Sequence, residues 1–286
     1  MPSALRAGFR RGDGLLGLVV WGVAIATLGL FSWVVGDVGL RGVSELSIAF
    51  LRESPADAGR AGGIAPILVS TGLILLVCLT AAIPIGVGAA ALLAEFTRTD
   101  GALGRTVRVS LDVLSGVPSI VFGLFGNVFF CVTLGLGFSI VSGGLTLACM
   151  VLPLVIRATE EGFRSVPDEI RQGAAALGFS RASTFAKLLL PAALPGLGVG
   201  LALGIGRALA ETAALLFTSG YVDRMPTSLS DSGRALSIHI YDLAMNVTGG
   251  EPRACATALV LVAVLVTANM AAASLTTRAS SASGIR

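Results

Sequence analysis

Charged side chains are scarce in this chain of 286 residues. Asp, Glu, Lys and Arg make up 13% of it, about half of the roughly 25% that is usual for soluble domains. The basic residues are spread along the sequence and the formal net charge is only +3. No basic stripe with interleaved aromatic residues occurs, so the sequence gives no indication of nucleic-acid binding. With a mean hydropathy of +0.87, the composition indicates a membrane protein.

Histidine and cysteine are also few, which bears on metal binding and on enzymatic chemistry. The chain has one histidine, His239, and four cysteines, none in a CxxC pair. We interpret the cysteines as small buried hydrophobic residues rather than as a disulfide framework or a zinc site. The scattered serines, cysteines and lone histidine do not supply the nucleophile with a neighbouring base, or the metal cluster, that an intramembrane enzyme needs. No GxxxxGKS or GxxxxGKT phosphate loop is present, so ATP hydrolysis by this chain is not expected.

Long apolar runs are abundant, because 54% of the residues are hydrophobic. Six runs approach the roughly 20 residues that cross a bilayer as a helix. The predicted spans are 14–36, 64–94, 110–131, 139–157, 195–220 and 255–275. The expected fold class is therefore an all-α integral membrane protein with six transmembrane helices. Pro84, Pro118 and Pro153 fall within spans, and each predicts a kink or a local break.

The basic residues of the connecting segments predict the orientation. Thirteen of the 20 lie before the first span, after the last one, or in the segments joining spans two to three and four to five, whereas six lie on the opposite side. By the positive-inside rule both termini are cytoplasmic. The first apolar run is too long for the hydrophobic region of a cleaved signal peptide, so we expect a retained anchor. Segments 37–63 and 221–254 are expected to form irregular or partly helical external caps.

The cytoplasmic segment 157–191 carries signals for helix starts and ends. Ser165 can cap one short helix, Gly178 suits the position that ends it, and Ser180 can cap a second short helix that ends before Pro191. Small residues on the first helix and an aromatic residue at the bend suit insertion into the groove of a partner protein. The alternative is an amphipathic connector on the membrane surface.

The run GRALAETAALL, residues 206–216, places an arginine and a glutamate inside an apolar segment. On a continuous helix Arg207 and Glu211 lie one above the other on one face. A charge at the bilayer centre costs roughly 2.5–3.5 kcal/mol, so such residues normally face the interior of a bundle or an aqueous path. Two interpretations follow: Arg207 binds a translocated anion and Glu211 neutralises it between anions, or the two form a structural ion pair. The hydroxyl of Thr212 can serve a ligand or a neighbouring helix.

The same segment carries a stripe of small residues at four-residue spacing, which permits close helix packing. The stripe consists of Gly196, Gly200, Gly204 and Ala208. We therefore expect this helix to be central in the bundle.

Four blocks of the sequence resemble the permeases of phosphate ABC importers, the PstA family. They are SGVPSIVFGLFG (115–126), GGLTLACMVLPLVIRATEEGFRSVP (143–167), LLLPAALPG (188–196) and GRALAETAALLFT (206–218). The cytoplasmic segment is similar to the EAA loop of ABC permeases, which couples them to an ATPase. Ala174, Gly178, Leu190 and Pro191 match that pattern, whereas Gln172, Gly173 and Leu188 depart from it. The residues assigned to coupling are Gln172, Gly173, Ala174, Ala175, Gly178, Phe179, Leu190 and Pro191.

The resemblance runs from about residue 63 to the last span and implies a type I importer permease of the MetI-like kind. It implies an N-terminal helix with its external segment over 1–62 and a permease domain over 63–280. The implied partners are a second, PstC-like permease, a dimer of a PstB-like ATPase that uses ATP and Mg, and an external PstS-like phosphate-binding protein. The implied location is the bacterial cytoplasmic membrane, and the pathway residues are Arg207, Glu211 and Thr212.

Two alternative functions stay open. Sequence chemistry does not separate phosphate from sulfate or molybdate, because all are tetrahedral oxyanions. Six helices with a buried Arg–Glu pair would also suit a secondary transporter or a channel, although neither needs a docking hairpin at 157–191.

Overall fold

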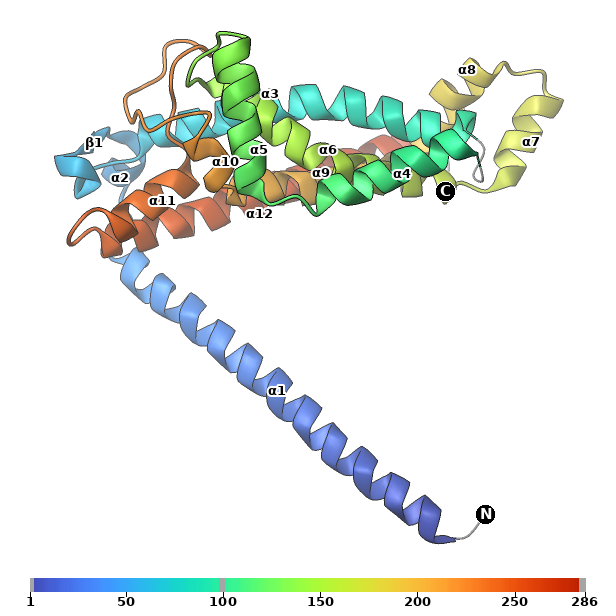
Figure 1. Cartoon of the computed structure of the whole chain (residues 1–286), viewed down its shortest axis with the longest axis horizontal. Helices are drawn as coiled ribbons and strands as arrows, with labels where there is room; N and C mark the ends of the chain where they lie inside the picture. Colours follow the sequence, from blue (N-terminus) through green and yellow to red (C-terminus); the bar gives the residue numbers. More distant parts are fainter. Residues whose placement is uncertain (1–2, 98–100, 283–286) are drawn as a thin grey trace.

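The computed structural model describes residues 3–97 and 101–282, with side chains over 16–97 and 101–274, and these residues are mostly helical (Figure 1). The long helices are α1 (Ser3–Val43), α3 (Ala65–Ala91), α6 (Ile140–Arg164), α9 (Leu190–Ala210) and α12 (Glu251–Ala282). The short helices are α2 (Ile48–Arg52), α4 (Ala102–Ser115), α5 (Ser119–Gly126), α7 (Asp168–Ala176), α8 (Arg181–Thr184), α10 (Ala213–Leu216) and α11 (Leu236–Met245). Wider π-helical turns form η2 (Leu92–Phe96), η3 (Asn127–Thr133) and η4 (Phe185–Leu189). The 3-10 turn η1 (Asp57–Gly59) joins the antiparallel strands β1 (Pro55–Ala56) and β2 (Ala61–Gly62).

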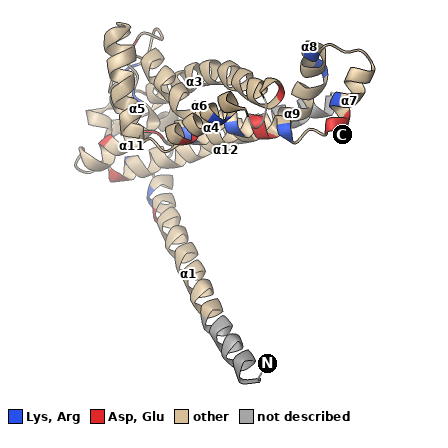
Figure 2. Ribbon diagram, turned by 45° about the vertical axis from the view of Figure 1, so that its right-hand side comes forward, with Lys and Arg blue, Asp and Glu red and all other residues tan. Residues whose placement is uncertain are grey.

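Within the described residues, five helical stretches are long and apolar enough to cross a membrane. They are Leu16–Val43, Ala65–Phe96, Ile140–Arg164, Arg181–Ala210 and Glu251–Ser274. Four of the six predicted spans are thereby confirmed, and the stretch Arg181–Ala210 begins and ends earlier than the predicted span 195–220. Charged residues gather around α7 and α8 at one end of the bundle, while the described part of α1 carries almost none until its end near α11 (Figure 2).

The third predicted span, 110–131, is broken at Pro118, where the sequence predicted a kink or a local break. Helices α4 and α5 meet at an angle of 99°. Pro118 has no N–H for an α-helical bond and disfavours helical backbone at Val117, which explains why the break falls there. Packing then sets the direction of α5, because a Cβ on Gly123 would lie 2.8 Å from Cα of Ala214 in α10.

The core of the bundle is made by α3, α6 and α9, and glycines bring α6 and α9 together. A Cβ on Gly162 of α6 would lie 2.9 Å from Cα of Gly196, and one on Gly200 would lie 3.1 Å from Cβ of Ala158. The predicted small-residue stripe is therefore confirmed as a packing face. α12 covers another side of α9, where Ile205 and Leu209 join Ala272 in a buried cluster.

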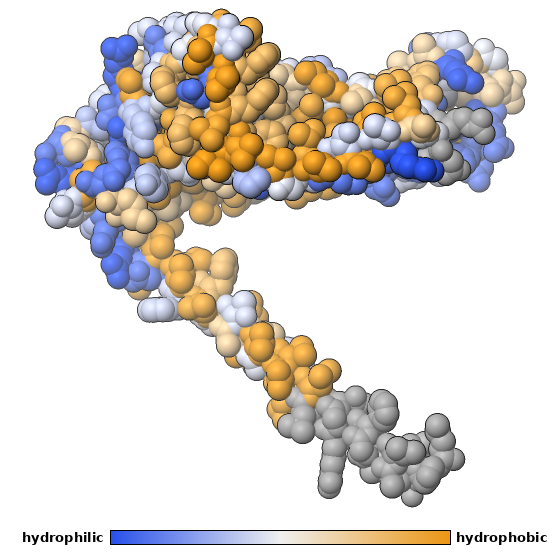
Figure 3. All heavy atoms as spheres, in the orientation of Figure 1, coloured by the Kyte–Doolittle hydropathy of each residue, from blue (hydrophilic) through white to orange (hydrophobic). Residues whose placement is uncertain are grey.

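Helix α1 leaves this bundle at its outer end and projects away from it (Figure 1). Its apolar membrane-length stretch is unburied, and apolar side chains line its described part as they line the bundle (Figure 3). At its outer end α1 packs against α12, where a Cβ on Gly42 would lie 2.8 Å from the backbone of Cys255. Arg253 at the start of α12 forms an ion pair with Glu45 at 2.9 Å and donates a 2.6 Å hydrogen bond to the carbonyl of Gly62.

The external segment 221–254 is partly helical, in agreement with its prediction. It contains α11, whose His239 is buried against Gly59. Nη1 of Arg234 lies 3.4 Å from Nδ1 of this histidine and donates a 3.1 Å hydrogen bond to Asp242. Burial, followed by the charge of Arg234, lowers the pKa of the His239 imidazole from 6.5 to about 4.

The histidine predicts a pH dependence of stability. The folded state holds His239 neutral. The contribution of this histidine to the free energy of unfolding is therefore fully present above pH 6.5 and is lost as the pH falls toward 4. This pKa difference corresponds to a loss of about 3 kcal/mol. We expect His239→Gln to weaken the decline of thermal stability between pH 6.5 and 4, measured on the detergent-solubilised protein. Parallel pH profiles for the two proteins would refute a titrating role.

Candidate functional site

The helix that carries Arg207 is interrupted immediately after it. α9 ends at Ala210, Glu211 has extended backbone (φ −78°, ψ 128°), and the short α10 begins at Ala213. The prediction of a continuous helix over 195–220, with Arg207 and Glu211 stacked on one face, is therefore wrong. Extended backbone at Glu211 turns its side chain away from the last turn of α9.

Glu211 stabilises this interruption through hydrogen bonds to α10 and α11. Its side chain is buried, and Oε1 accepts a 3.1 Å hydrogen bond from the backbone N–H of Ala214. Its backbone carbonyl accepts a 2.6 Å hydrogen bond from the hydroxyl of Ser237 in α11. Among the described residues, Glu211 and Arg207 form no ion pair. The expected neutralisation of Arg207 by Glu211 is thus replaced by a capping role for the glutamate.

Arg207 lies on an open face about half way along the bundle. Its neighbour Ala208 belongs to the buried cluster of Leu147 and Val151, which stand near the middle of α6. Arg207 itself is exposed, as are Leu203 one turn before it and Val199 two turns before it. A guanidinium at this depth has no described carboxylate within ion-pair distance. The interruption also leaves Thr212 partly exposed beside this face.

The cytoplasmic hairpin, which we define as residues 168–189, begins later than predicted. Residues 157–164 continue α6, and Ser165 follows the end of that helix and donates a hydrogen bond back to the carbonyl of Gly162 instead of capping α7. The second helix was predicted to end before Pro191, but the chain stays helical from Arg181 to Ala210. The π-helical η4 precedes the proline, where the missing N–H removes an α-helical bond.

The turn of the hairpin matches its prediction. Gly178 has φ +75°, and its N–H donates to the carbonyl of Ala175 while the N–H of Phe179 donates to that of Ala174. This pair of bonds is the Schellman ending of a helix. Ser180 caps α8, since its hydroxyl accepts from the N–H of Ser183.

The residues predicted to couple the chain to an ATPase fall into two groups. Ala174 is buried, and Leu190 and Pro191 are partly buried at the start of α9. The exposed group comprises Gln172, Gly173, Ala175, Gly178 and Phe179. Leu177, beside this group, is 78% exposed. An exposed apolar patch among small residues is the kind of surface that a partner protein covers.

Sequence reasoning missed a set of ion pairs at the cytoplasmic end. Glu160 of α6 is buried and accepts 3.0 Å hydrogen bonds from Arg108 and Arg164. Both arginines also donate to the carbonyl of Leu93, in the π-helical η2. The four-residue spacing of Glu160 and Arg164 was visible in the sequence, but Arg108 is 52 residues away from Glu160.

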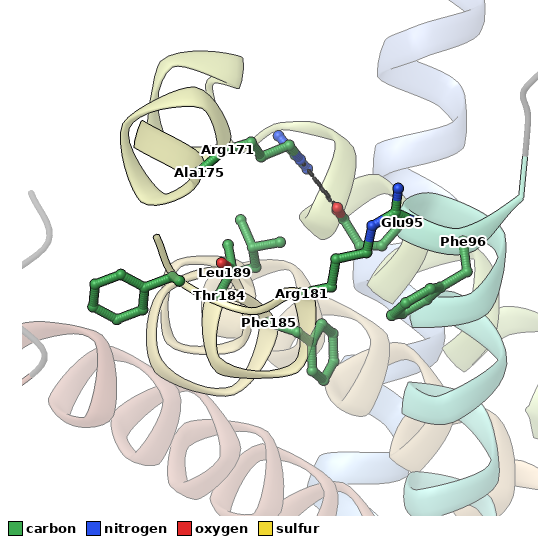
Figure 4. A pocket seen from close by; sticks show the side chains of 9 residues that line it. Glu95, Phe96, Arg171, Ala175, Arg181, Thr184, Phe185 and Leu189 are labelled. Carbon is green, nitrogen blue, oxygen red and sulfur yellow. Dashed lines mark hydrogen bonds and ion pairs between the residues drawn. The ribbon is translucent and has the colours of Figure 1, made fainter. Parts of the chain in front are cut away.

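A second missed interaction lies beside the hairpin. Arg171 reaches from α7 to Glu95 of η2, across a cavity of about 240 Å³ that Phe185 and Leu189 also line (Figure 4). Together, the interrupted apolar helix, the charged cytoplasmic end and the exposed hairpin define a multi-pass membrane transport subunit.

Comparisons with known proteins agree with this class. Residues 82–280 match the sequence profile of the family described as binding-protein-dependent transport system inner membrane component. The probable ABC transporter permease protein YqgI of Bacillus subtilis is 34% identical over 271 residues, covering 88% of this chain and 90% of that protein. The phosphate transport system permease protein PstA 1 of Mycobacterium tuberculosis is 36% identical over 215 residues, covering 74% and 70%.

Solved structures agree on the fold. A subunit of a bacterial ABC transporter involved in the import of the acidic polysaccharide alginate superposes with a TM-score of 0.63 at 15% identity, over 96% of this chain and 99% of that one. The chain belongs to the family of binding-protein-dependent transport system inner membrane components, the permease subunits of ABC importers.

Proposed function

We propose that this chain is the permease subunit of an ATP-driven importer of inorganic phosphate. The observation that carries the proposal is Arg207, a guanidinium at mid-depth on an open face of the bundle, beside an interrupted helix. A guanidinium is permanently charged and offers two parallel hydrogen bonds to an oxyanion. The named phosphate permeases among its relatives make phosphate the preferred anion over sulfate or molybdate.

The open faces also support the proposed partners. Helix α1 exposes apolar side chains along its described length, and α9 exposes Val199 and Leu203 next to Arg207. A second permease of PstC type, together with lipid, would cover these faces and complete the pathway. The exposed patch at Leu177 and Phe179 would dock onto a dimer of a PstB-like ATPase, which would bind ATP and Mg.

An external PstS-like phosphate-binding protein would deliver the anion to the opposite end, near α11 and the β1–β2 turn. In this arrangement the complex lies in a bacterial cytoplasmic membrane, with the hairpin on the cytoplasmic side as the positive-inside rule requires.

The test is uptake of radiolabelled phosphate by proteoliposomes that contain the whole complex. We expect uptake to require ATP and the binding protein, and to fall less than about twofold with a hundredfold excess of sulfate, because a hydrogen-bonding site rejects anions that lack its matching donors and acceptors. Equal competition by sulfate or molybdate would indicate a permease for another oxyanion. Uptake that is independent of ATP would indicate a secondary transporter or a channel.

A further inference from the structure

Arg171 is the most densely bonded side chain of the cytoplasmic hairpin. Its Nε and Nη2 donate to the two carboxylate oxygens of Glu95, at 3.1 and 2.6 Å. Nη1 donates to the carbonyl of Val166 at 2.6 Å and to Asp168 at 3.2 Å, and Nη2 also donates to the carbonyl of Phe163 at 2.9 Å. One guanidinium therefore joins α7 to the end of α6 and, across 76 positions of sequence, to the end of α3.

Apart from Arg171, α7 makes few buried contacts with the bundle. Ala174 is its only fully buried residue, and a Cβ on Gly173 would meet nothing within 4 Å. Ile170, which is partly buried, packs against the buried cluster that contains Leu93 and Phe163. A two-pronged arginine–carboxylate pair in a partly buried site is stronger than an exposed ion pair, and the side chains of Arg171 and Glu95 are 25% and 12% exposed. Arg171 is thus the main polar attachment of α7.

Glu95 lies in the π-helical turn that ends the α3 span. In η2 the wider turn replaces the regular α-helical bonding pattern. The carbonyl of Leu93 in this turn accepts from Arg108 and Arg164, which fix it to α4 and α6. In Figure 4 Arg171 points from α7 toward Glu95, and the dashed line marks their ion pair.

The N-terminal half of α3 lies beside the interruption that follows α9. Thr71 near its outer end accepts a 2.9 Å hydrogen bond from the N–H of Leu236, at the start of α11. A small cavity lined by Thr71 and Ile74 is also lined by Ala208 and Leu215, which stand on opposite sides of the break at Glu211. The helical stretch Ala65–Phe96, formed by α3 and η2, therefore connects the surroundings of Arg171 with the surroundings of Arg207.

We propose that Arg171 is a positioning residue that locks the cytoplasmic hairpin to α3 through Glu95, so that movement of the hairpin is delivered to α3 and from there to the interruption in α9. The proposal rests on the proposed function, because it assumes a partner ATPase that moves the hairpin. It predicts that breaking the Arg171–Glu95 pair separates ATP hydrolysis from transport, whereas a merely structural pair would lower both together.

The first test measures ATP hydrolysis and phosphate uptake on the same proteoliposomes for Arg171→Gln and Glu95→Gln. We expect each variant to retain its partners on purification and to hydrolyse ATP, with phosphate imported per ATP reduced about fivefold. Asp168→Asn, which removes only the most exposed partner of Arg171, is the matched control and should change the ratio less than about twofold. Unchanged uptake per ATP in both variants, or an equal fall of ATP hydrolysis and uptake in them, would overturn the proposal.

A second test does not depend on the substrate. Spin labels at Glu169 on α7 and at Phe96, both exposed and outside the docking patch, report the distance between the hairpin and the end of α3 in a background without the native cysteines. We expect this distance to stay constant between the nucleotide-free and the ATP-trapped complex, and to change in Arg171→Gln. If this distance changes with nucleotide while the Arg171–Glu95 pair is intact, the proposal that the pair locks the hairpin to α3 is wrong. If the wild-type complex does not import phosphate, the proposed substrate is wrong. The distance measurement still tests the role of Arg171 in that case, because it does not use phosphate.

Discussion

Replacing Arg207 by alanine is expected to abolish phosphate uptake while the complex still assembles. Two hydrogen bonds to a charged group together contribute about 3–5 kcal/mol, so we expect the loss of this guanidinium to lower uptake by at least about a hundredfold. Arg207 lies in the last turn of the span that ends at Ala210, and removing a charge from an apolar segment does not make membrane insertion less favourable. Poor insertion would therefore not account for the loss.

The conservative variant separates charge from geometry at this position. Arg207→Lys keeps the positive charge but loses the planar pair of donors, and we expect it to retain about a tenth of wild-type uptake. Uptake is measured in proteoliposomes with radiolabelled phosphate, and assembly by co-purification of the partner subunits. Normal uptake by Arg207→Ala would remove the arginine from the pathway and leave it a structural role on the face of α9.

The second large effect is expected at the turn of the hairpin. Gly178 has φ +75° and a Cβ there would meet nothing within 4 Å, so a substitution acts through backbone strain and not through a clash. A β-branched residue in this left-handed conformation costs about 2 kcal/mol, which corresponds to about thirtyfold in the population of the docked hairpin. We expect Gly178→Val to lose most of the co-purifying ATPase and most ATP-driven uptake.

Asparagine provides the matched control, because it tolerates the left-handed conformation and also ends helices in this way. Gly178→Asn should therefore keep ATPase association within about threefold of wild type. The measurement is the amount of ATPase subunit that co-purifies with the permease. If Gly178→Val and wild type co-purify with equal amounts of the ATPase subunit, the conformation of this turn does not matter for docking.

Local signals in the sequence were sufficient for several features of the structure. Long apolar runs predicted four of the spans, since a helix is the only way for such a run to satisfy its backbone in lipid. Glycine at four-residue spacing predicted the contact of Gly196 and Gly200 with α6. Gly178 predicted the end of α7, because its conformation is one that few other residues adopt.

Other features depend on partners that are distant in sequence. Pro118 indicated a break, but the 99° bend also depends on the packing of Gly123 against α10. Spacing placed Arg207 and Glu211 on one helical face, whereas the hydrogen bond from Ser237 to the Glu211 carbonyl and the capping of Ala214 hold an extended residue there. The departure of α1 from the bundle carries no local signal, because its apolar residues suit a neighbouring helix or lipid equally.

The sequence by itself therefore determined the membrane class of this protein, the positions of most spans, the turn of the hairpin and the presence of an arginine within the bilayer. Each of these follows from a preference of a residue or a short run for one environment or one backbone conformation. Only the tertiary structure decided that Arg207 faces outward without Glu211 and that Arg171 joins the hairpin to Glu95. The partners of Arg207 and Arg171 depend on which side chains the folded chain brings within hydrogen-bond distance. Local sequence does not determine this, because the folded chain brings together residues that are far apart in the sequence.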